Sequence, residues 1–465
     1  MFKRILLAVL VLLLVTSCAD QTNLLPFLKE IASDITFNGK TFYIMSDISP
    51  SDSVHETFLS YGATTQNYDA AMKRFADVEK QFDCVLEFTT PIGSRDMLTA
   101  ATAGSKIDLV IHPIYYGGFG DIMQGIYTPI SEIPAIDYMN SEKWGSPNML
   151  EIFCYQNDIY GVIPALWPIS NIMSSDFLLV INEEMAAKNS ITDPRDLFEQ
   201  GLWTHENFYE TVTLFYNNED PNRIIYGYAG SERHFMEMAL KSFNVDFLGE
   251  GLSNGYKRPE FIEALDWAKQ LLIGEYSEMA RFNGMDCIDY WVDERTGIAT
   301  VHMNYLASMS GRDSSSAIIN SDKEYGIVPF PSLDGKTIHA QYERVINAIM
   351  FPSWEITNED MGIIANAIFE PFEGLDTIEK QIEDLNTNLF FDERDSQLIF
   401  DMMTQAKYLY HDEGINDFHT SLVGSMKTKS SAQIQQENVS VLDSIIEKYI
   451  IPARTSMENI FGSEE

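Results

Sequence analysis

The stretch Thr41-Phe42-Tyr43-Ile44-Met45 begins the part of the chain that decides its fold class. Its β-branched and aromatic residues predict a β-strand. Apolar residues at helical spacing predict a helix over residues 68–82, and a second helix is expected over 94–103. Two further apolar runs, 84–88 and 107–111, predict strands on either side of that second helix. This alternation of strands and helices predicts a parallel sheet with helices on its faces.

A second segment of the same kind begins at residues 177–182, another apolar run that predicts a strand. Helices are expected to begin at Pro194 and Pro259, because proline suits the first turn of a helix. Residues 296–348 are rich in β-forming residues, and the chain is expected to be mostly helical from Asn358 onward. The predicted class is therefore α/β. In such sheets, ligands lie beyond the carboxyl ends of the strands.

Length and composition predict a globular protein of two lobes or one large α/β unit. The chain has 465 residues, of which 45% are hydrophobic and 12% aromatic, which is too apolar for a disordered protein. Without residues 1–17 it keeps 448 residues, and without Lys3 and Arg4 it keeps 29 of its 31 basic side chains against 69 acidic ones. Its formal net charge is then −40. Such an acidic surface repels nucleic acid, so a nucleic-acid partner is not expected.

The N-terminus combines a positively charged start, residues 1–4, with an apolar run over residues 5–15 and the tetrapeptide Val15-Thr16-Ser17-Cys18. This order resembles a bacterial lipoprotein signal. The resemblance implies that residues 1–17 are a signal peptide, that Cys18 receives a diacylglycerol, and that residues 18–35 tether the protein to the extracytoplasmic face of the cell membrane. An ordinary signal peptide and a membrane-spanning helix are the alternatives. The apolar run of 11 residues is well short of the roughly 20 that spanning requires.

Three cysteines remain besides Cys18, namely Cys84, Cys154 and Cys287, and all have apolar neighbours. They are interpreted as small buried hydrophobic residues, although one disulfide between two of them stays open.

The segment Asp158-Ile159-Tyr160-Gly161-Val162-Ile163-Pro164 resembles the "G-x-x-Y-G-V-P" stretch of the extracellular solute-binding proteins of family 1. These proteins are the capture subunits of ABC importers, and the group contains maltodextrin-binding protein. Asn157 replaces the expected glycine and Ile163 is an insertion, so the chain resembles a divergent member. Further stretches match the family in order, at residues 101–110, 177–185, 191–204, 282–301 and 325–331.

The resemblance implies a two-lobed, type II periplasmic-binding-protein-like fold, in which hinge crossings join two mostly parallel sheets flanked by helices. The first lobe would comprise residues 36–168 plus 297–346, and the second 172–294 plus 350–457. The crossings would lie near residues 165–168 and 345–347.

The implied function is capture of a carbohydrate, with an oligosaccharide as the expected form, by closure of the two lobes and delivery to ABC permease subunits. The chain is expected to act as a monomer. A sensor kinase in place of the permease stays open, as does a non-sugar solute.

Sugar rings suit aromatic faces together with amides and carboxylates, so such residues at strand ends are the candidate ligand contacts. Each has a structural alternative, since an aromatic residue in such a loop is more often packed than bound to ligand. Trp203 and Trp267 are assigned to packing, because both lie on apolar faces that flank helices. The candidate contacts are Trp167 and Tyr305, which are favoured, and Asp47, Tyr115, Tyr116, Tyr228, Glu232, Arg233, Asn304 and Tyr342.

No catalytic residue, metal site or cofactor is predicted, because the eight histidines form no HExxH motif and no phosphate-binding loop is complete. Residues 251–255 match the Gly-x-Ser-x-Gly pattern of hydrolases, but their polar surroundings indicate a loop. The chain is therefore expected not to be an enzyme. The alternative is a secreted lipoprotein glycoside hydrolase with a carboxylate pair in its cleft.

Overall fold

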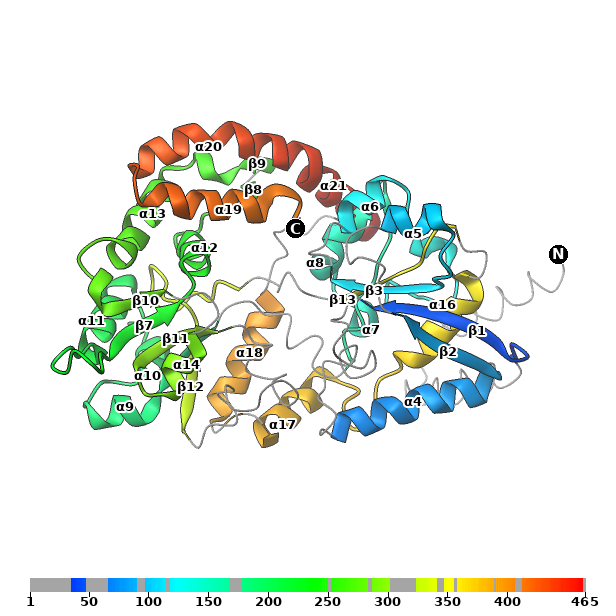
Figure 1. Cartoon of the computed structure of the whole chain (residues 1–465), viewed down its shortest axis with the longest axis horizontal. Helices are drawn as coiled ribbons and strands as arrows, with labels where there is room; N and C mark the ends of the chain where they lie inside the picture. The colour runs from blue at the N-terminus through cyan, green and yellow to red at the C-terminus, as the bar shows by residue number, and fades with distance from the viewer. Residues whose placement is uncertain are drawn as a thin grey trace.

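The computed structural model describes residues 35–46, 66–89, 97–113, 118–167, 178–246, 248–249, 252–282, 287–301, 323–340, 347–354, 358–388, 390, 392–405 and 412–462. Within these ranges the chain forms a four-stranded and a five-stranded sheet, each with its own helices, and two short hairpins. Figure 1 shows the two sheets in separate bodies, which we call the first lobe and the second lobe. The predicted α/β fold with two lobes is confirmed.

The first lobe is built on the sheet β13-β3-β1-β2. Strand β1 runs parallel to β2 and to β3, as predicted, and β13 closes the edge antiparallel to β3. Phe42 of β1 is buried with Phe75 and Phe82 of α4, because the helix places both rings on the face toward the sheet. The elements of this lobe before the first crossing are β1 (Lys40–Ser46), α4 (Gln66–Phe82), β2 (Cys84–Thr89), α5 (Met97–Ala103), β3 (Leu109–Pro113), α6 (Gly118–Met123), α7 (Ser141–Trp144), α8 (Pro147–Leu150), β4 (Cys154–Tyr155) and β5 (Asp158–Ile159).

The second lobe is built on the sheet β10-β7-β11-β6-β12. Strands β10, β7 and β11 are parallel neighbours, whereas β6 runs antiparallel to both β11 and β12. All residues of β6, β11 and β12 are buried, which explains their uninterrupted apolar sequences. Its elements up to the second crossing are β6 (Leu178–Asn182), α9 (Glu183–Lys188), α10 (Pro194–Glu199), α11 (His205–Phe215), β7 (Tyr226–Gly230), α12 (Glu232–Ser242), β8 (Leu248–Gly249), β9 (Ser253–Asn254), α13 (Pro259–Leu272), β10 (Ala280–Phe282), α14 (Cys287–Val292), β11 (Thr296–Val301) and β12 (Tyr325–Val328).

The prediction that residues 297–346 belong to the first lobe is wrong, because β11 and β12 pair within the second sheet. The next described strand, β13 (Asn347–Met350), belongs to the first lobe, where it pairs with β3. The crossing expected near residues 345–347 therefore runs in the opposite direction, from the second lobe to the first. Both sheets accept buried apolar strands, so the sequence pattern did not distinguish between them.

The assignment of residues 350–457 to the second lobe is correct only in its middle part. Helix α16 packs on α4 of the first lobe, α18 packs on β12, and α19 and α20 pack on α12 and α13 of the second lobe. The chain then crosses again, and α21 packs on β4 of the first lobe. The helices of this part are α16 (Asn358–Ile368), α17 (Ile378–Asn388), α18 (Glu393–Gln405), α19 (Asp412–Met426), α20 (Ser431–Ile445) and α21 (Ile451–Phe461).

Local signals in the sequence match local structure closely. Asp193 caps α10, where its carboxylate accepts a hydrogen bond from the amide of Arg195 at 2.9 Å, and Pro194 stands in the first turn.

Cys84 and Cys154 are buried and free, so no disulfide joins two of the three cysteines considered above. None of the helices in the described ranges combines the length and the apolar character needed to cross a lipid bilayer.

Candidate functional site

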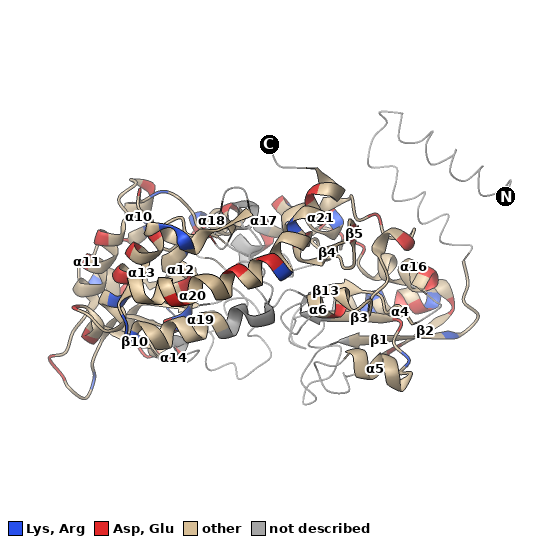
Figure 2. Ribbon diagram, turned by 90° about the horizontal axis from the view of Figure 1, so that it is seen from above, with Lys and Arg blue, Asp and Glu red and all other residues tan. Residues whose placement is uncertain are grey.

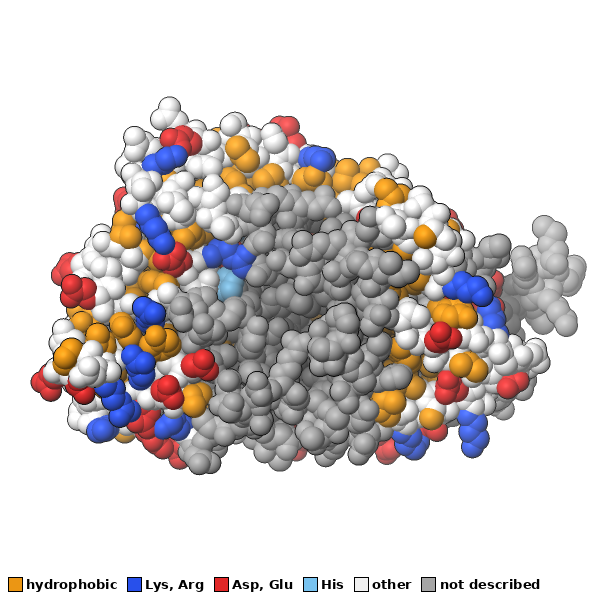
Figure 3. All heavy atoms as spheres, in the orientation of Figure 1, with side chains coloured by type: hydrophobic (Ala, Val, Ile, Leu, Met, Phe, Trp, Pro, Cys, Tyr) orange, Lys and Arg blue, Asp and Glu red, His pale blue; other side chains and the backbone are white. Residues whose placement is uncertain are grey.

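Six of the ten predicted ligand contacts lie outside the described residues, and so does the predicted lipidation site Cys18. The six are Asp47, Tyr115, Tyr116, Asn304, Tyr305 and Tyr342. On the face of the molecule in Figure 3, acidic, basic and hydrophobic side chains are interspersed over the described part of the surface. The four remaining candidates, Trp167, Tyr228, Glu232 and Arg233, are placed by the structure.

Trp167 is the last described residue before the first crossing. Its side chain is only 2% exposed. Its ring lies 5.2 Å from that of Phe369 and 5.0 Å from that of Phe372, measured between centroids. A sugar needs an open ring face for stacking. The burial therefore favours a packing role, in which Trp167 fixes the start of the crossing.

Tyr228 is a core residue of the second lobe. It is fully buried in β7, and its hydroxyl shares a hydrogen bond with the hydroxyl of Thr300 on the neighbouring strand β11. The rings of Phe208, Phe235 and Phe282 lie within 6.0 Å of its own. These contacts leave no ring face for a ligand.

Glu232 and Arg233 occupy a position that suits ligand contact. Strand β7 ends at Gly230, and α12 begins at Glu232, so both side chains follow the carboxyl end of a strand that has parallel neighbours on both sides. The ammonium group of Lys427 lies 2.8 Å from each carboxylate oxygen of Glu232. Arg233 is about 15% exposed, and its Nη2 lies 2.7 Å from Nε2 of the adjacent histidine.

A buried polar network holds this end of α12 in place. The Nδ1 atom of His419 lies 2.8 Å from the carboxylate of Glu237, and the hydroxyl of Tyr256 lies 2.9 Å from Nε2 of the same imidazole. Arg233 reaches the same carboxylate at 3.5 Å. Burial raises the pKa of Tyr256 well above its usual value, and the charge of Glu237 adds to this effect. The network joins α12, the turn that precedes α13, and α19. It therefore restricts the orientation of the Arg233 side chain.

Sequence reasoning missed this network because its members are far apart in the chain. Glu237 and His419 are separated by 182 positions, and neither belongs to a recognisable motif. The only available signal was the polar character of these residues within helices of otherwise apolar faces.

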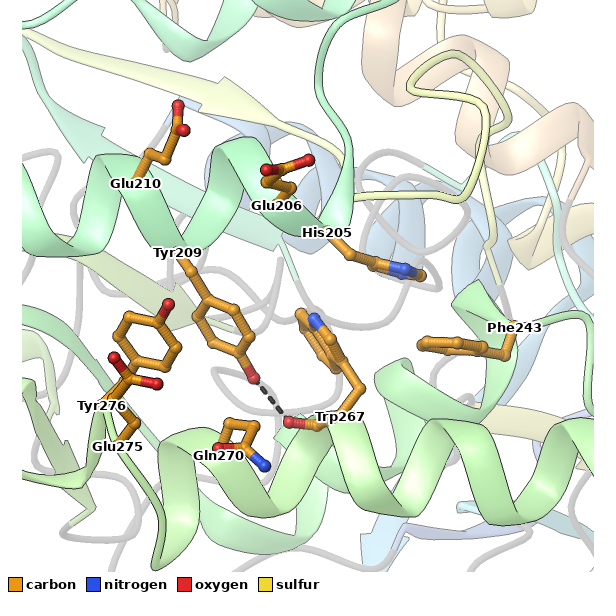
Figure 4. A pocket seen from close by; sticks show the side chains of 9 residues that line it. All are labelled: His205, Glu206, Tyr209, Glu210, Phe243, Trp267, Gln270, Glu275 and Tyr276. Carbon is orange, nitrogen blue, oxygen red and sulfur yellow. Dashed lines mark hydrogen bonds between the residues drawn. The ribbon is translucent and has the colours of Figure 1, made fainter.

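A pocket of about 570 Å³ lies between α11 and α13 of the second lobe (Figure 4). His205, Tyr209 and Trp267 form its wall, and their rings pack against one another and stack on Phe243 and Tyr276. The Tyr209 hydroxyl donates to the backbone oxygen of Trp267 at 2.6 Å. Most ring faces are thus covered, as the assignment of Trp267 to packing requires. The lining residues are His205, Glu206, Tyr209, Glu210, Phe243, Trp267, Gln270, Glu275 and Tyr276.

The chemistry of this pocket is that of a packed helix interface with an acidic rim. Burial lowers the pKa of His205 to about 4, so its ring is neutral at physiological pH, and its Nε2 lies 2.9 Å from the hydroxyl of Ser242. Glu206, Glu210 and Glu275 stand at the rim. No described His, Cys, Asp or Glu side chains gather in threes or more with the geometry of a metal site.

No protein-family model matches the sequence, and a comparison with curated proteins gives no match. Solved structures do match. The substrate-binding protein Lmo0181 of Listeria monocytogenes, in complex with cycloalternan, is 12% identical, with a TM-score of 0.57 over 88% of this chain and 99% of that one.

Maltose-bound MalE3 of T. maritima is 11% identical, with a TM-score of 0.57 over 87% of this chain and 100% of that one. UgpB of Mycobacterium tuberculosis, in complex with glycerophosphocholine, is 11% identical, with a TM-score of 0.58 over 89% and 99% of the two chains. The chain therefore has the two-lobed fold of ABC substrate-binding proteins, as the resemblance of its sequence to the family 1 solute-binding proteins implies.

Proposed function

We propose that this chain is a non-enzymatic receptor that binds a carbohydrate or polyol between its lobes and delivers it to an ABC importer. The observation that carries the proposal is the architecture: two separate sheets, joined by chain crossings, in the fold of substrate-binding proteins. Solved proteins of this fold hold maltose, maltotetraose, mannotriose, tagatose, mannitol or ribitol.

Closure of the lobes explains how binding becomes a signal. A solute that touches both lobes makes more contacts in the closed form than in the open form. This difference in binding free energy shifts the population toward the closed form, which a permease can recognise.

The contacts that we propose combine sequence and structure. Glu232 and Arg233 stand at the carboxyl end of β7, where the hydroxyl groups of a sugar can donate to a carboxylate and accept from a guanidinium. The tyrosines among the candidates outside the described residues, with Tyr305 foremost, would supply the aromatic faces.

The first test is a thermal unfolding screen of the purified protein against the six sugars and polyols named above. A true ligand at about 100 times its dissociation constant stabilises the folded state by about 2.7 kcal/mol. We expect at least one compound to raise the unfolding temperature in a concentration-dependent way. If none does so up to millimolar concentration, the proposed ligand class is wrong.

The second test uses two arginines at opposite ends of the same strand. Arg233→Gln removes a charge at the carboxyl end of β7 and should weaken binding about tenfold, or about 1.4 kcal/mol. Arg223→Gln removes a charge before the amino end, where Arg223 is exposed and pairs loosely with Glu294 at 3.8 Å, and should leave the affinity unchanged. Equal effects on calorimetric affinity would contradict the proposed position of the ligand.

The same incubations separate a receptor from a glycoside hydrolase. A receptor returns the oligosaccharide unchanged, as chromatography of the released ligand would show. Shorter products that disappear on substitution of one carboxylate would favour the hydrolase.

We also propose that Cys18 carries the lipid and holds the protein on the extracytoplasmic face of the cell membrane. The support is the signal-like order of residues 1–18. Metabolic labelling with an alkyne fatty acid should mark the native protein and not the Cys18→Ser variant. Equal labelling of both would exclude this anchor.

A further inference from the structure

One long helical segment connects the two lobes. Helix α20, the turn Ile446–Ile450 and α21 follow one another without a break from Ser431 to Phe461. Figure 1 shows this segment running across the top of the molecule from the second lobe to the first, and Figure 2 shows the same course from above. A continuous helix resists bending. Movement of one lobe relative to the other therefore depends on where this helix is attached and where its hydrogen bonding is interrupted.

The α20 half is attached to the second lobe. The side-chain amide of Gln435 donates to the backbone oxygen of Tyr256 at 2.7 Å. The carboxylate of Asp443 accepts from the amide of Asn254 at 2.9 Å and pairs with Lys257 at 2.9 Å. These bonds run along the helix and hold it against the turn that precedes α13.

The α21 half is attached to the first lobe. Arg454 makes a bidentate ion pair with the buried carboxylate of Glu151, at 2.9 Å through Nε and 2.8 Å through Nη2. The hydroxyl of Ser456 accepts from the backbone amide of Asn157 at 3.2 Å, and Asn459 donates to the side chain of the same asparagine at 2.7 Å. This half therefore moves with the first lobe.

The turn between the two halves is a π-helix, and the sequence provides a cause. The amide of Ile451 donates to the carbonyl of Ile446, five residues back. Pro452 follows at once, and it has no amide hydrogen to donate to the carbonyl of Lys448. Its ring would also collide with that carbonyl in a regular α-helix, so a wider turn relieves the contact. The helix is thus weakest at the point where it passes between the lobes.

We infer that the π-helical turn Ile446–Ile450 is a joint, about which α21 and the first lobe tilt relative to α20 and the second lobe. The inference rests on the proposed function in so far as solute binding would drive this tilt. Because α20 is fixed to the second lobe and α21 to the first, the joint is a point that belongs to both bodies. The closure axis must then pass close to residues 446–450.

Hydrogen exchange of the purified protein without ligand tests the weakness of the joint. Amides of residues 447–451 should exchange at least about tenfold faster than those of the buried residues Leu442 and Ala453 on either side. Uniform protection from 442 to 457 would overturn the inference.

Distance measurements test whether the joint governs lobe motion. Bio-orthogonal spin labels at the exposed positions Lys73 on α4 and Glu210 on α11 report the separation of the lobes. Pro452→Ala restores the missing amide and should narrow the distance distribution and slow exchange at the joint about tenfold. Pro259→Ala, a matched change in the first turn of α13 within one lobe, should alter neither.

An unchanged distribution in Pro452→Ala would overturn the inference, and so would a single narrow distribution in the unsubstituted protein. These measurements use no solute. A failed ligand screen would therefore refute the proposed function and leave the outcome of the exchange and distance measurements unaffected.

Discussion

Substitution of Arg195 by methionine should destabilise the second lobe more than any other single loss of charge in the described part of the chain. Arg195 is 6% exposed and joins three elements. Its guanidinium pairs with Glu183 at the start of α9, with Asp193 at 2.7 Å before α10, and with Asp395 of α18 at 3.3 Å. Methionine keeps the length of the apolar stem but removes all of these bonds.

The size of the expected loss of stability follows from the buried carboxylate that the substitution leaves without its partner. Asp395 is fully buried, and its only other described partner is the backbone amide of Ile327, at 3.1 Å. Loss of one partner of a buried ion pair leaves an uncompensated charge and costs about 3–5 kcal/mol. Arg394 provides the control. It is 37% exposed and pairs with Asp392 at the surface, so Arg394→Met should cost about 1 kcal/mol or less.

The cost should depend on pH in a defined direction. Burial raises the pKa of Asp395 to about 7, whereas an unfolded aspartate titrates near 4. Between these values the folded chain binds a proton that the unfolded chain does not, so the stability due to Asp395 falls as the pH rises. At pH 5 the carboxyl group is neutral in both variants, and the penalty of Arg195→Met should shrink relative to pH 8.

Urea unfolding followed by tryptophan fluorescence at pH 5 and pH 8 measures these differences. Trp203 and Trp291 are fully buried in the second lobe and report its unfolding. The reasoning is refuted if Arg195→Met and Arg394→Met lose the same stability at pH 8, or if the loss in Arg195→Met grows on acidification.

Three further predictions, one with a matched control variant, test the packing and the network. Trp167→Ala should cost about 3–5 kcal/mol in urea unfolding, because the ring is buried; a loss of sugar affinity without loss of stability would instead identify a ligand platform. Gly227→Ala should cost about 3 kcal/mol, since its Cβ would lie 1.9 Å from the backbone oxygen of Val212, whereas Gly424→Ala meets open space on a helix and should add roughly 0.5–1 kcal/mol. Equal unfolding midpoints for these two variants would contradict the packing. Tyr256→Phe leaves its buried histidine partner short of one hydrogen bond and should cost about 1–3 kcal/mol, with an unchanged urea midpoint as the opposing result.

The sequence alone determined the local elements and the class of fold. Residues 41–45, 68–82 and 84–88 lie in β1, α4 and β2, with ends that differ by at most two residues. The prolines at 194 and 259 mark the starts of α10 and α13. Such signals depend on neighbours within a few positions. They are therefore still readable in a chain that is only 11–15% identical to solved structures of the same fold.

The tertiary structure alone decided which lobe receives each late element. The apolar runs of β11 and β12 fit either sheet, and only pairing with β7 and β6 places them in the second lobe. The contacts of Arg195 with Asp395 and of Glu237 with His419 span 200 and 182 positions. A strand's sequence specifies that it must be buried and hydrogen-bonded, whereas its partner is specified by the fit of all the elements around it.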